Sequence, residues 1–459
     1  MTTISEPTVL EPLPSQLPSV ERRAVMPAGF RAAGRAIGIK ASGRPDLAVI
    51  VTTEGPAAAA GVFTSNAFAA APVGLTRANF AATSGDARGG FGLAGAVICT
   101  SGSANAATGQ AGWDDQVEVA RLLADVAGTS PDRTVLLSTG VIGTRLPVDR
   151  IADGLSAVRG DLAASNDALH AAATAFRTTD SVTKVATTAV DLPGKGGGSV
   201  RVTVTGIAKG VGMIHPNMAT MLAVLLTDAA VEPETLWGLL RPAAARTWDQ
   251  ISVDGDTSTN DSAVVLASGS APNAPIDPGS AAAAALGGAI EAVARDLARQ
   301  QAADGEGATT LITAQVSGAG DDADARAVAR AIVSSSLVKA AVHGRDPNWG
   351  RIGGAIGNAR LGPREVLEAA GVDNAEATAR GGTPARVDPR RVRIAIGGHA
   401  VFDGAAGGPL SFDRAAARAA MDSKELLIRV DLGLGGGTGE AFGCDLTEQY
   451  VLENSEYTT

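Results

Sequence analysis

A small residue followed by a hydroxyl residue stands where a polar loop meets an apolar run. Ala219 and Thr220 lie between a stretch rich in Gly, Pro and Asn and the apolar residues 221–226, which are typical of a buried strand. If the Ala219–Thr220 peptide bond were cut, Thr220 would carry a free α-amino group beside its own hydroxyl. An α-amino group has a pKa of roughly 7.7–8.0, so it can act as the base that activates the hydroxyl. The alternative is an uncleaved core strand in which Thr220 has no chemical role.

Two further places combine residue types that could assist such a nucleophile. Thr139 and Gly140 follow a predicted strand that ends at Ser138, and a hydroxyl with backbone N–H groups at such a turn can form an oxyanion hole. A loop of small residues is the alternative. Glu306 has glycine on both sides, so its carboxylate is uncrowded and could pair with an amino group. The alternative for Glu306 is a solvated turn at the end of a helix.

The sequence gives no support for a metal or a bound cofactor. The polar run 254–261 begins with the Asp-x-Asp-x-Ser spacing of a calcium loop, but Thr259 replaces the required glycine and Val265 the required glutamate. The four histidines and two cysteines lack metal-ligand spacing. The glycine-rich residues 433–437 lack the Lys-Ser/Thr of a phosphate-binding loop. We therefore predict neither a metal nor a cofactor.

The composition is that of a globular protein and argues against several classes of function. Of 459 residues, 45% are hydrophobic, 19% are charged and 3% are aromatic, and the formal net charge is −10. Such an acidic chain with few rings is unsuited to binding nucleic acid, and no stretch is long and apolar enough for a bilayer. Arg22 and Arg23 precede no hydrophobic segment, so we predict no export signal. With two distant cysteines, the expected location is the reducing cytoplasm.

The apolar pattern predicts both strands and helices. Strands are expected at residues 47–52, 96–100, 134–138, 200–205, 221–227, 263–267, 310–316, 391–396 and 426–430. Helices are expected at residues 114–127, 233–245, 281–302, 323–342 and 363–370. The predicted fold class is therefore α/β or α+β with more than one sheet. Residues 1–28 contain many Pro, Ser and Glu residues and are predicted to form a flexible tail.

Taken together, these runs resemble the glutamate N-acetyltransferase family, also called ornithine acetyltransferase. The resemblance covers nearly the whole ordered chain. Its most specific landmark is the Lys-Gly-x-Gly-Met-Ile-x-Pro-Asn-Met-Ala-Thr-Met-Leu stretch at residues 209–222. The other landmarks follow in the family's order at residues 63–66, 138–140, 178–180, 254–261, 304–307, 346–351 and 454–459.

The resemblance implies a fold and a maturation step. The fold would have layered sheets flanked by helices, like N-terminal-nucleophile enzymes and of the ornithine acetyltransferase and aminopeptidase type. The precursor would cut itself between Ala219 and Thr220 into an α chain, residues 29–219, and a β chain, residues 220–459. A pair of such heterodimers, α2β2, is the expected assembly.

The resemblance also implies an acyltransferase reaction of arginine biosynthesis. Thr220 would take the acetyl group from N2-acetyl-L-ornithine, release ornithine, and pass the group to L-glutamate in a ping-pong mechanism. Acetyl-CoA is an additional donor in some family members, and the sequence leaves its use by this chain open.

Single positions take roles from the same resemblance. Thr139, by its side chain, and Gly140, by its backbone N–H, match the oxyanion-hole pair. Lys209 suits the substrate α-carboxylate, and Glu306 suits the side-chain ammonium of ornithine. The substrate-binding positions of the family are matched by Thr179 (or its neighbour Thr178), Lys209, Thr220, Glu306, Asn454 and Thr459.

Two alternatives remain open at the level of sequence. The first is a related N-terminal-nucleophile amidase or aminopeptidase, in which water takes the acyl group. The second is an uncleaved binding protein without catalysis. The charged residues Lys209 and Glu306 suit amino-acid ligands and favour the transferase.

Overall fold

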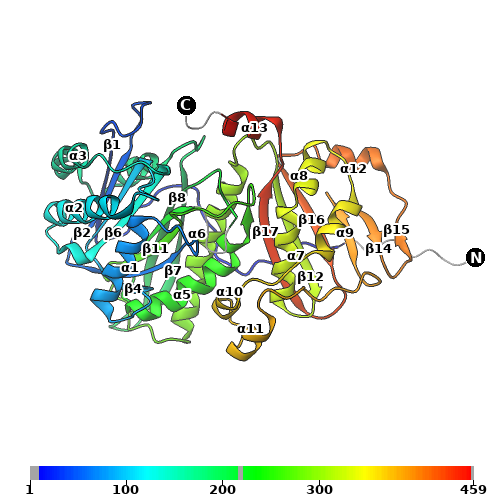
Figure 1. Cartoon of the computed structure of the whole chain (residues 1–459). Coiled ribbons are helices and arrows are strands. Elements are labelled where there is room, and N and C mark those ends of the chain that lie inside the picture. The colour runs from blue at the N-terminus through cyan, green and yellow to red at the C-terminus, as the bar shows by residue number, and fades with distance from the viewer. Residues whose placement is uncertain (1–9, 216–220, 456–459) are drawn as a thin grey trace, which may run out of the picture. The chain divides into compact units, whose positions relative to one another are not determined.

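The computed structural model of the chain describes residues 10–215 and 221–455, and Figure 1 labels its elements. Contacts between residues divide the chain into two compact units. The larger unit comprises residues 17–244 and 256–301, and the smaller comprises residues 1–16, 245–255 and 302–459. The expected boundary between α and β chains, at residues 219 and 220, falls inside the larger unit and so does not separate the two.

Two sheets form the larger unit. The four-stranded sheet has the order β1-β2-β5-β6 and contains β1 (Phe30–Arg35), β2 (Leu47–Thr52), β5 (Ala96–Ser103) and β6 (Thr134–Val141). The six-stranded sheet has the order β4-β3-β11-β9-β8-β7 and contains β3 (Ala57–Phe63), β4 (Phe91–Ala94), β7 (Lys184–Pro193), β8 (Ser199–Lys209), β9 (Leu222–Thr227) and β11 (Ser262–Ala267). At the centre of this sheet, β9 runs parallel to β11 and antiparallel to β8.

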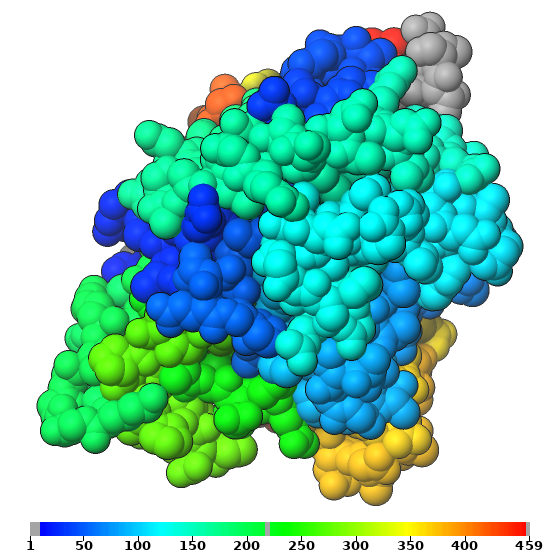
Figure 2. Space-filling model, turned by 90° about the vertical axis from the view of Figure 1, so that its left-hand side faces the viewer, coloured from blue at the N-terminus to red at the C-terminus, as the bar shows by residue number. Residues whose placement is uncertain are grey.

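Helices alternate with these sheets in layers. They are α1 (Ala71–Ser84), α2 (Gly109–Ala127), α3 (Val148–Asp161) and α4 (Asn166–Phe176), with most of α5 (Pro233–Arg246) and α6 (Ala281–Ala303). Phe80 of α1 and Phe176 of α4 are buried in one core together with residues of both sheets. The opposite face of the four-stranded sheet packs against α2 and α3, which form much of the cyan and teal surface in Figure 2. A Cβ at Gly206 would meet Val293 at 2.6 Å, so glycine lets α6 pack closely on β8.

The smaller unit is built on one mixed sheet of order β10-β17-β12-β16-β13-β14-β15. Its strands are β10 (Ile251–Ser252), β12 (Leu311–Ala319), β13 (Arg393–Ile396), β14 (His399–Asp403), β15 (Gly408–Pro409), β16 (Glu425–Asp431) and β17 (Gly437–Cys444). Its helices are α7 (Asp322–Ser334), α8 (Ser336–His343), α9 (Trp349–Gly357), α10 (Arg364–Ala369), α11 (Asn374–Arg380), α12 (Arg414–Ala420) and α13 (Glu448–Ser455). Apolar residues of α7, α8 and α9 share a core with the central strands.

The predicted class, mixed α and β with layered sheets, is confirmed, and each predicted strand overlaps an observed one. One helix prediction was wrong. Residues 323–342 form two helices, because the chain turns at Ser335, whose hydroxyl accepts a hydrogen bond from Val338 N–H and caps α8. Among the described residues, no helix is long and apolar enough to cross a membrane.

Part of the segment predicted as a flexible tail is held by hydrogen bonds. Glu21 forms an antiparallel bridge with Thr187 of β7. The hydroxyls of Thr187 and Thr205 donate to the carbonyls of Arg23 and Val25, both at 2.6 Å. These residues therefore extend the larger unit along β7 and β8.

Candidate active site

The carboxyl ends of β5 and β6 place the predicted oxyanion-hole residues. We expected Thr139 and Gly140 to follow a strand that ends at Ser138. The strand β6 instead continues to Val141, so both residues belong to the strand. Gly140 has φ +131° and pairs with Gly102 of β5. A Cβ at Gly140 would lie 2.3 Å from the carbonyl carbon of Gly102, so the two backbones can meet only through glycine.

A lysine from the neighbouring sheet reaches this strand end. Lys209 is the last residue of β8, is buried, and donates from Nζ to Thr139 Oγ1 at 3.1 Å. Its carbonyl accepts a hydrogen bond from Gln301 at 2.7 Å, and in the sheet it pairs with Leu222 of β9. The structure thus brings together Lys209 and Thr139, which are 70 residues apart in sequence, beside the start of β9.

A buried ion pair fixes the turn that carries the predicted threonines. Lys184 Nζ donates to Asp180 Oδ1 at 2.7 Å, and neither side chain is exposed. The same oxygen accepts from Gly210 N–H at 2.8 Å, while Oδ2 accepts from Thr178 N–H at 3.0 Å. Asp180 therefore links the Thr178–Thr179 turn to the residue that follows Lys209.

The charges around Asp180 decide its ionisation. Burial alone would raise the pKa of its carboxyl, but the Lys184 and Lys209 ammonium groups and the hydrogen bonds from Lys184 and Gly210 hold the pKa below its ordinary value. Asp180 is thus an anion that is already occupied by protein groups, and it is suited to a structural role. Asp180 belongs to the predicted motif at residues 178–180, in which only the threonines had a predicted role.

Lys40 is a second cation near this region. Burial, reinforced by the positive charges of Arg44 and Lys209, lowers the pKa of Lys40 to about 8. Its ammonium donates to the carbonyl of Pro45 at 2.6 Å. By contrast, burial raises the pKa of the Cys99 thiol to about 12, which makes Cys99 a poor nucleophile.

A buried asparagine from the polar run 254–261 braces the same strand ends. Asn260 Nδ2 donates to the carbonyl of Ala104 at 2.7 Å and to that of Ser138 at 2.8 Å. Within residues 10–215 and 221–455, no group of three or more His, Cys, Asp or Glu residues is suited to a metal. The spacing of residues around Asn260 does not indicate these hydrogen bonds, because their acceptors lie more than 100 residues away in sequence.

In the smaller unit, two predicted substrate-binding residues contact each other. Asn454 of α13 donates from Nδ2 to Glu306 Oε2 at 3.0 Å, across 148 residues of sequence. The glycines beside Glu306 serve the packing of this turn. A Cβ at Gly305 would lie 2.7 Å from Cys444 Sγ, and one at Gly307, whose φ is +67°, would lie 2.5 Å from Tyr450 N. They let the turn approach the C-terminal segment, a packing role that the sequence spacing did not indicate.

Three predicted positions, Ala219, Thr220 and Thr459, lie outside the described residues. Thr179 is exposed and Thr178 is half-buried. The described chain resumes at Met221, whose carbonyl accepts a hydrogen bond from Ser262 N–H at 2.9 Å.

Comparison with known proteins finds relatives of this chain. The ArgJ family model matches residues 31–459. The arginine biosynthesis bifunctional protein ArgJ of Synechocystis sp. is 43% identical over 449 residues, which are 96% of this chain and 98% of that protein. The protein of the same description from Thermus thermophilus is 43% identical over 434 residues, 95% of this chain and 99% of that protein. A crystal structure of ornithine acetyltransferase complexed with ornithine, from Mycobacterium tuberculosis, is 37% identical, has a TM-score of 0.37, and covers 43% of this chain and 98% of that chain.

Proposed function

The chain belongs to the ArgJ family, and from that membership we propose that it transfers an acetyl group from N2-acetyl-L-ornithine to L-glutamate in arginine biosynthesis. Relatives that are 43% identical over nearly the full chain carry the description of arginine biosynthesis bifunctional proteins. The observation in the chain that most supports the proposal is the contact between Lys209 and Thr139 at the entrance to β9. This contact places the Lys209 ammonium, which can bind a substrate carboxylate, beside the Thr139 hydroxyl, which can donate to an oxyanion.

The reaction begins with maturation of the chain. The Thr220 hydroxyl oxygen attacks the carbonyl carbon of Ala219, the C–N bond breaks, and an ester links the two residues. Water hydrolyses that ester, which leaves the Ala219 carboxylate and the free α-amino group of Thr220. That amine then serves as the base for the same hydroxyl.

Acetyl transfer repeats this chemistry on the substrate. The Thr220 oxygen attacks the acetyl carbonyl carbon while its proton passes to the α-amine. The resulting oxyanion accepts hydrogen bonds from the Thr139 hydroxyl and Gly140 N–H, each worth about 2.7–4 kcal/mol of barrier in such sites. The C–N bond to ornithine then breaks, and the departing nitrogen takes the proton. The amine of glutamate attacks the threonyl ester by the reverse sequence.

The charged residues would select the two substrates. We assign Lys209, with Thr179, to the α-carboxylate, because Lys209 is a buried cation at the end of β8. Glu306 and Asn454 are assigned to the side-chain end of the substrate, where a carboxylate pairs with the ornithine ammonium. Thr459 is proposed as a further substrate-binding residue.

Acetyl-CoA is proposed as a second donor to Thr220, because the relatives are described as bifunctional. No bound cofactor or metal enters this scheme. We further propose an α2β2 assembly of the cleaved chains. A cytoplasmic location is also proposed, since both described cysteines are buried free thiols.

The test is the maturation and activity of Thr220→Ala. The wild-type chain should give two fragments, the second with the N-terminal sequence Thr-Met-Leu-Ala, and should release ornithine from acetylornithine only when glutamate is present. Thr220→Ala should stay intact and inactive, whereas Thr220→Ser, which keeps a hydroxyl, should still be cleaved. Normal cleavage of Thr220→Ala would refute the nucleophile, glutamate-independent release would indicate an amidase, and an assay with acetyl-CoA as sole donor tests the second activity.

A further inference from the structure

The helix that carries Asn454 is held mainly at one end. None of the described residues of α13 is buried, and Val451 and Leu452 are more than 60% exposed. At its N-terminal end, Thr447 donates from its hydroxyl to the carbonyl of Gly307 at 2.7 Å. The position of Asn454 against Glu306 therefore depends on polar contacts near the first turn of α13.

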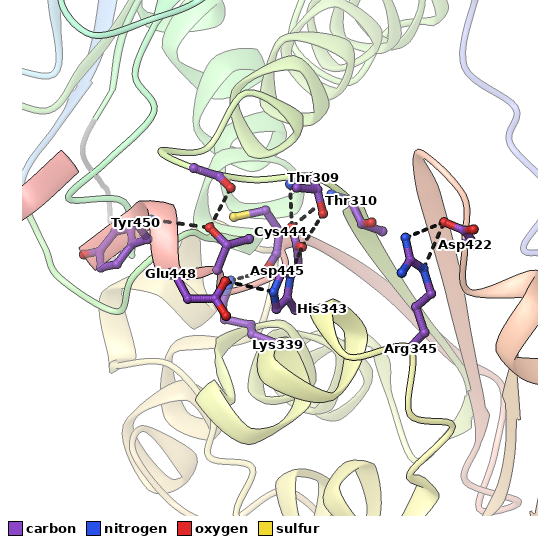
Figure 3. Close-up of polar contacts among 12 residues, drawn as sticks. Thr309, Thr310, Lys339, His343, Arg345, Asp422, Cys444, Asp445, Glu448 and Tyr450 are labelled. Atoms are coloured by element: carbon purple, nitrogen blue, oxygen red, sulfur yellow. Dashed lines mark hydrogen bonds and ion pairs between the residues drawn. The ribbon is translucent and has the colours of Figure 1, made fainter. Parts of the chain in front are cut away.

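A histidine with two carboxylate partners forms the centre of these contacts (Figure 3). His343, the last residue of α8, lies with Nδ1 3.3 Å from Asp445 Oδ2 and with Nε2 3.1 Å from Glu448 Oε2. Asp445 is fully buried, whereas Glu448 is 85% exposed and belongs to the first turn of α13. His343 thus links the exposed Glu448 side chain of α13 to the buried Asp445.

The same anchor holds the segment that follows Glu306. Asp445 Oδ1 accepts hydrogen bonds from the backbone N–H groups of Thr309 and Thr310, at 2.8 and 2.9 Å. Its Oδ2 accepts from the Thr309 hydroxyl at 2.6 Å. Asp445 and His343 therefore connect the segment after Glu306 with the start of the helix that carries Asn454.

The bridge requires a protonated ring. A neutral imidazole has one N–H, whereas the imidazolium donates from both nitrogens and can serve both carboxylates at once. The end of a helix also favours a cation. The other charged or titratable groups on the neighbouring elements include Lys339, Cys444, Asp254, Arg345, Asp422, Glu306 and Tyr450. Lys339 donates to the carbonyls of Ser252 and Cys444, and Arg345 pairs with Asp422 at 2.6 Å, which leaves Asp445 and Glu448 as the direct partners of His343.

We propose that His343 is a positioning residue for the ornithine end of the substrate: its protonated ring joins Asp445 to Glu448 and thereby holds Asn454 against Glu306. This inference rests on the proposed function for its substrate but not for its structural link. Histidine titrates at about pH 5–8. When the ring of His343 is neutral it can donate to only one of the two carboxylates, so one link is lost, α13 loosens, and acetylornithine binds less tightly.

The experiment compares wild type, His343→Gln and the matched control His399→Gln by steady-state kinetics over a range of pH. In wild type, KM for acetylornithine should rise by up to about fivefold with increasing pH, as expected for losing one largely exposed ion pair. In His343→Gln, KM should stay at its high-pH value throughout, with kcat changed less than twofold relative to wild type at each pH. His399→Gln should behave like wild type. A pH dependence of KM that persists in His343→Gln, or a loss confined to kcat, would overturn the proposal.

A second measurement does not depend on catalysis. Amide hydrogen exchange of residues 446–455, corrected for the intrinsic effect of pH, should become faster at high pH in wild type and should be fast at every pH in His343→Gln. Glu448→Gln, which changes an exposed side chain, should weaken the same protection and covers the case in which His343→Gln does not fold. Unchanged protection in these variants refutes the link itself, whereas the absence of acetyl transfer by wild type refutes only the proposed function.

Discussion

Replacement of Asp180 by Asn tests whether a buried ion pair supports the candidate site. The Asp180 and Lys184 side chains are fully buried and 2.7 Å apart, so the variant removes the negative charge that Asp180 presents to the Lys184 ammonium. Removing one partner of a buried pair costs about 3–5 kcal/mol. The Asn oxygen can still accept from Thr178 or Gly210, which keeps the loss within that range. With a slope of about 3 kcal/mol per molar urea, the unfolding midpoint should fall by about 1 M or more.

Two matched variants make this test specific. Asp180→Asn combined with Lys184→Met removes both charges and should recover most of the lost stability, because apolar replacement of a buried pair is often neutral. Asp191→Asn removes a carboxylate from an exposed pair with Arg201 on the same hairpin, and should cost about 0–1 kcal/mol.

The pH dependence has a defined sign. Since the pKa of Asp180 is lowered in the folded state, its stabilisation is present above the unfolded pKa of about 3.9 and is lost as the pH falls further. The stability difference between wild type and Asp180→Asn should therefore shrink in acid. A loss below 1 kcal/mol at neutral pH, or a double variant no more stable than the single one, would refute the reasoning.

Three further variants or probes address other parts of the site. Gly140→Ala should lower the free energy of unfolding, measured by urea titration, by about 2–6 kcal/mol, since its Cβ would lie 2.3 Å from Gly102 and φ is +131°. The control Gly143→Ala, with positive φ but no described atom within 4 Å of the new Cβ, should lower it less. Lys40, with a pKa of about 8, should react with an acylating reagent half-maximally near that pH by mass spectrometry, and a midpoint above about pH 10 would contradict the lowered value. Glu306→Gln should raise KM for acetylornithine and leave self-cleavage intact on a denaturing gel, whereas equal loss of both would argue against a ligand role.

Nine strands were predicted because they are continuous apolar runs bounded by turn residues. The strands β1, β3, β4, β7, β10, β14, β15 and β17 were not predicted. The sequence predicted residues 47–52 with the bounds observed for β2. The break between α7 and α8 was missed because apolar spacing continues through Ser335, and only its capping hydrogen bond marks the new helix. Local periodicity therefore identifies the class of an element better than its end.

The candidate site was predictable in its residue types but not in its contacts. The family resemblance supplied Thr139, Lys209, Glu306 and Asn454, and the structure pairs them through hydrogen bonds across 70 and 148 residues. Such contacts depend on sheet order and on the packing of a C-terminal segment, which local sequence does not encode. For the same reason the roles of Asp180, Asn260 and His343, whose partners come from other segments, had no signal in spacing.

The strand order explains how a chain could be cut beside its active site without losing its sheet. In the order β4-β3-β11-β9-β8-β7, the central pair β11 and β9 follows the proposed cut, whereas the two strands on each side precede it. The ladder between β8 and β9 begins at Leu222, so breaking the bond between residues 219 and 220 removes none of its pairs. Either fragment alone would expose unpaired strand edges, which are prone to association. The proposed cleavage would therefore follow folding, and the sheet would hold the two fragments together.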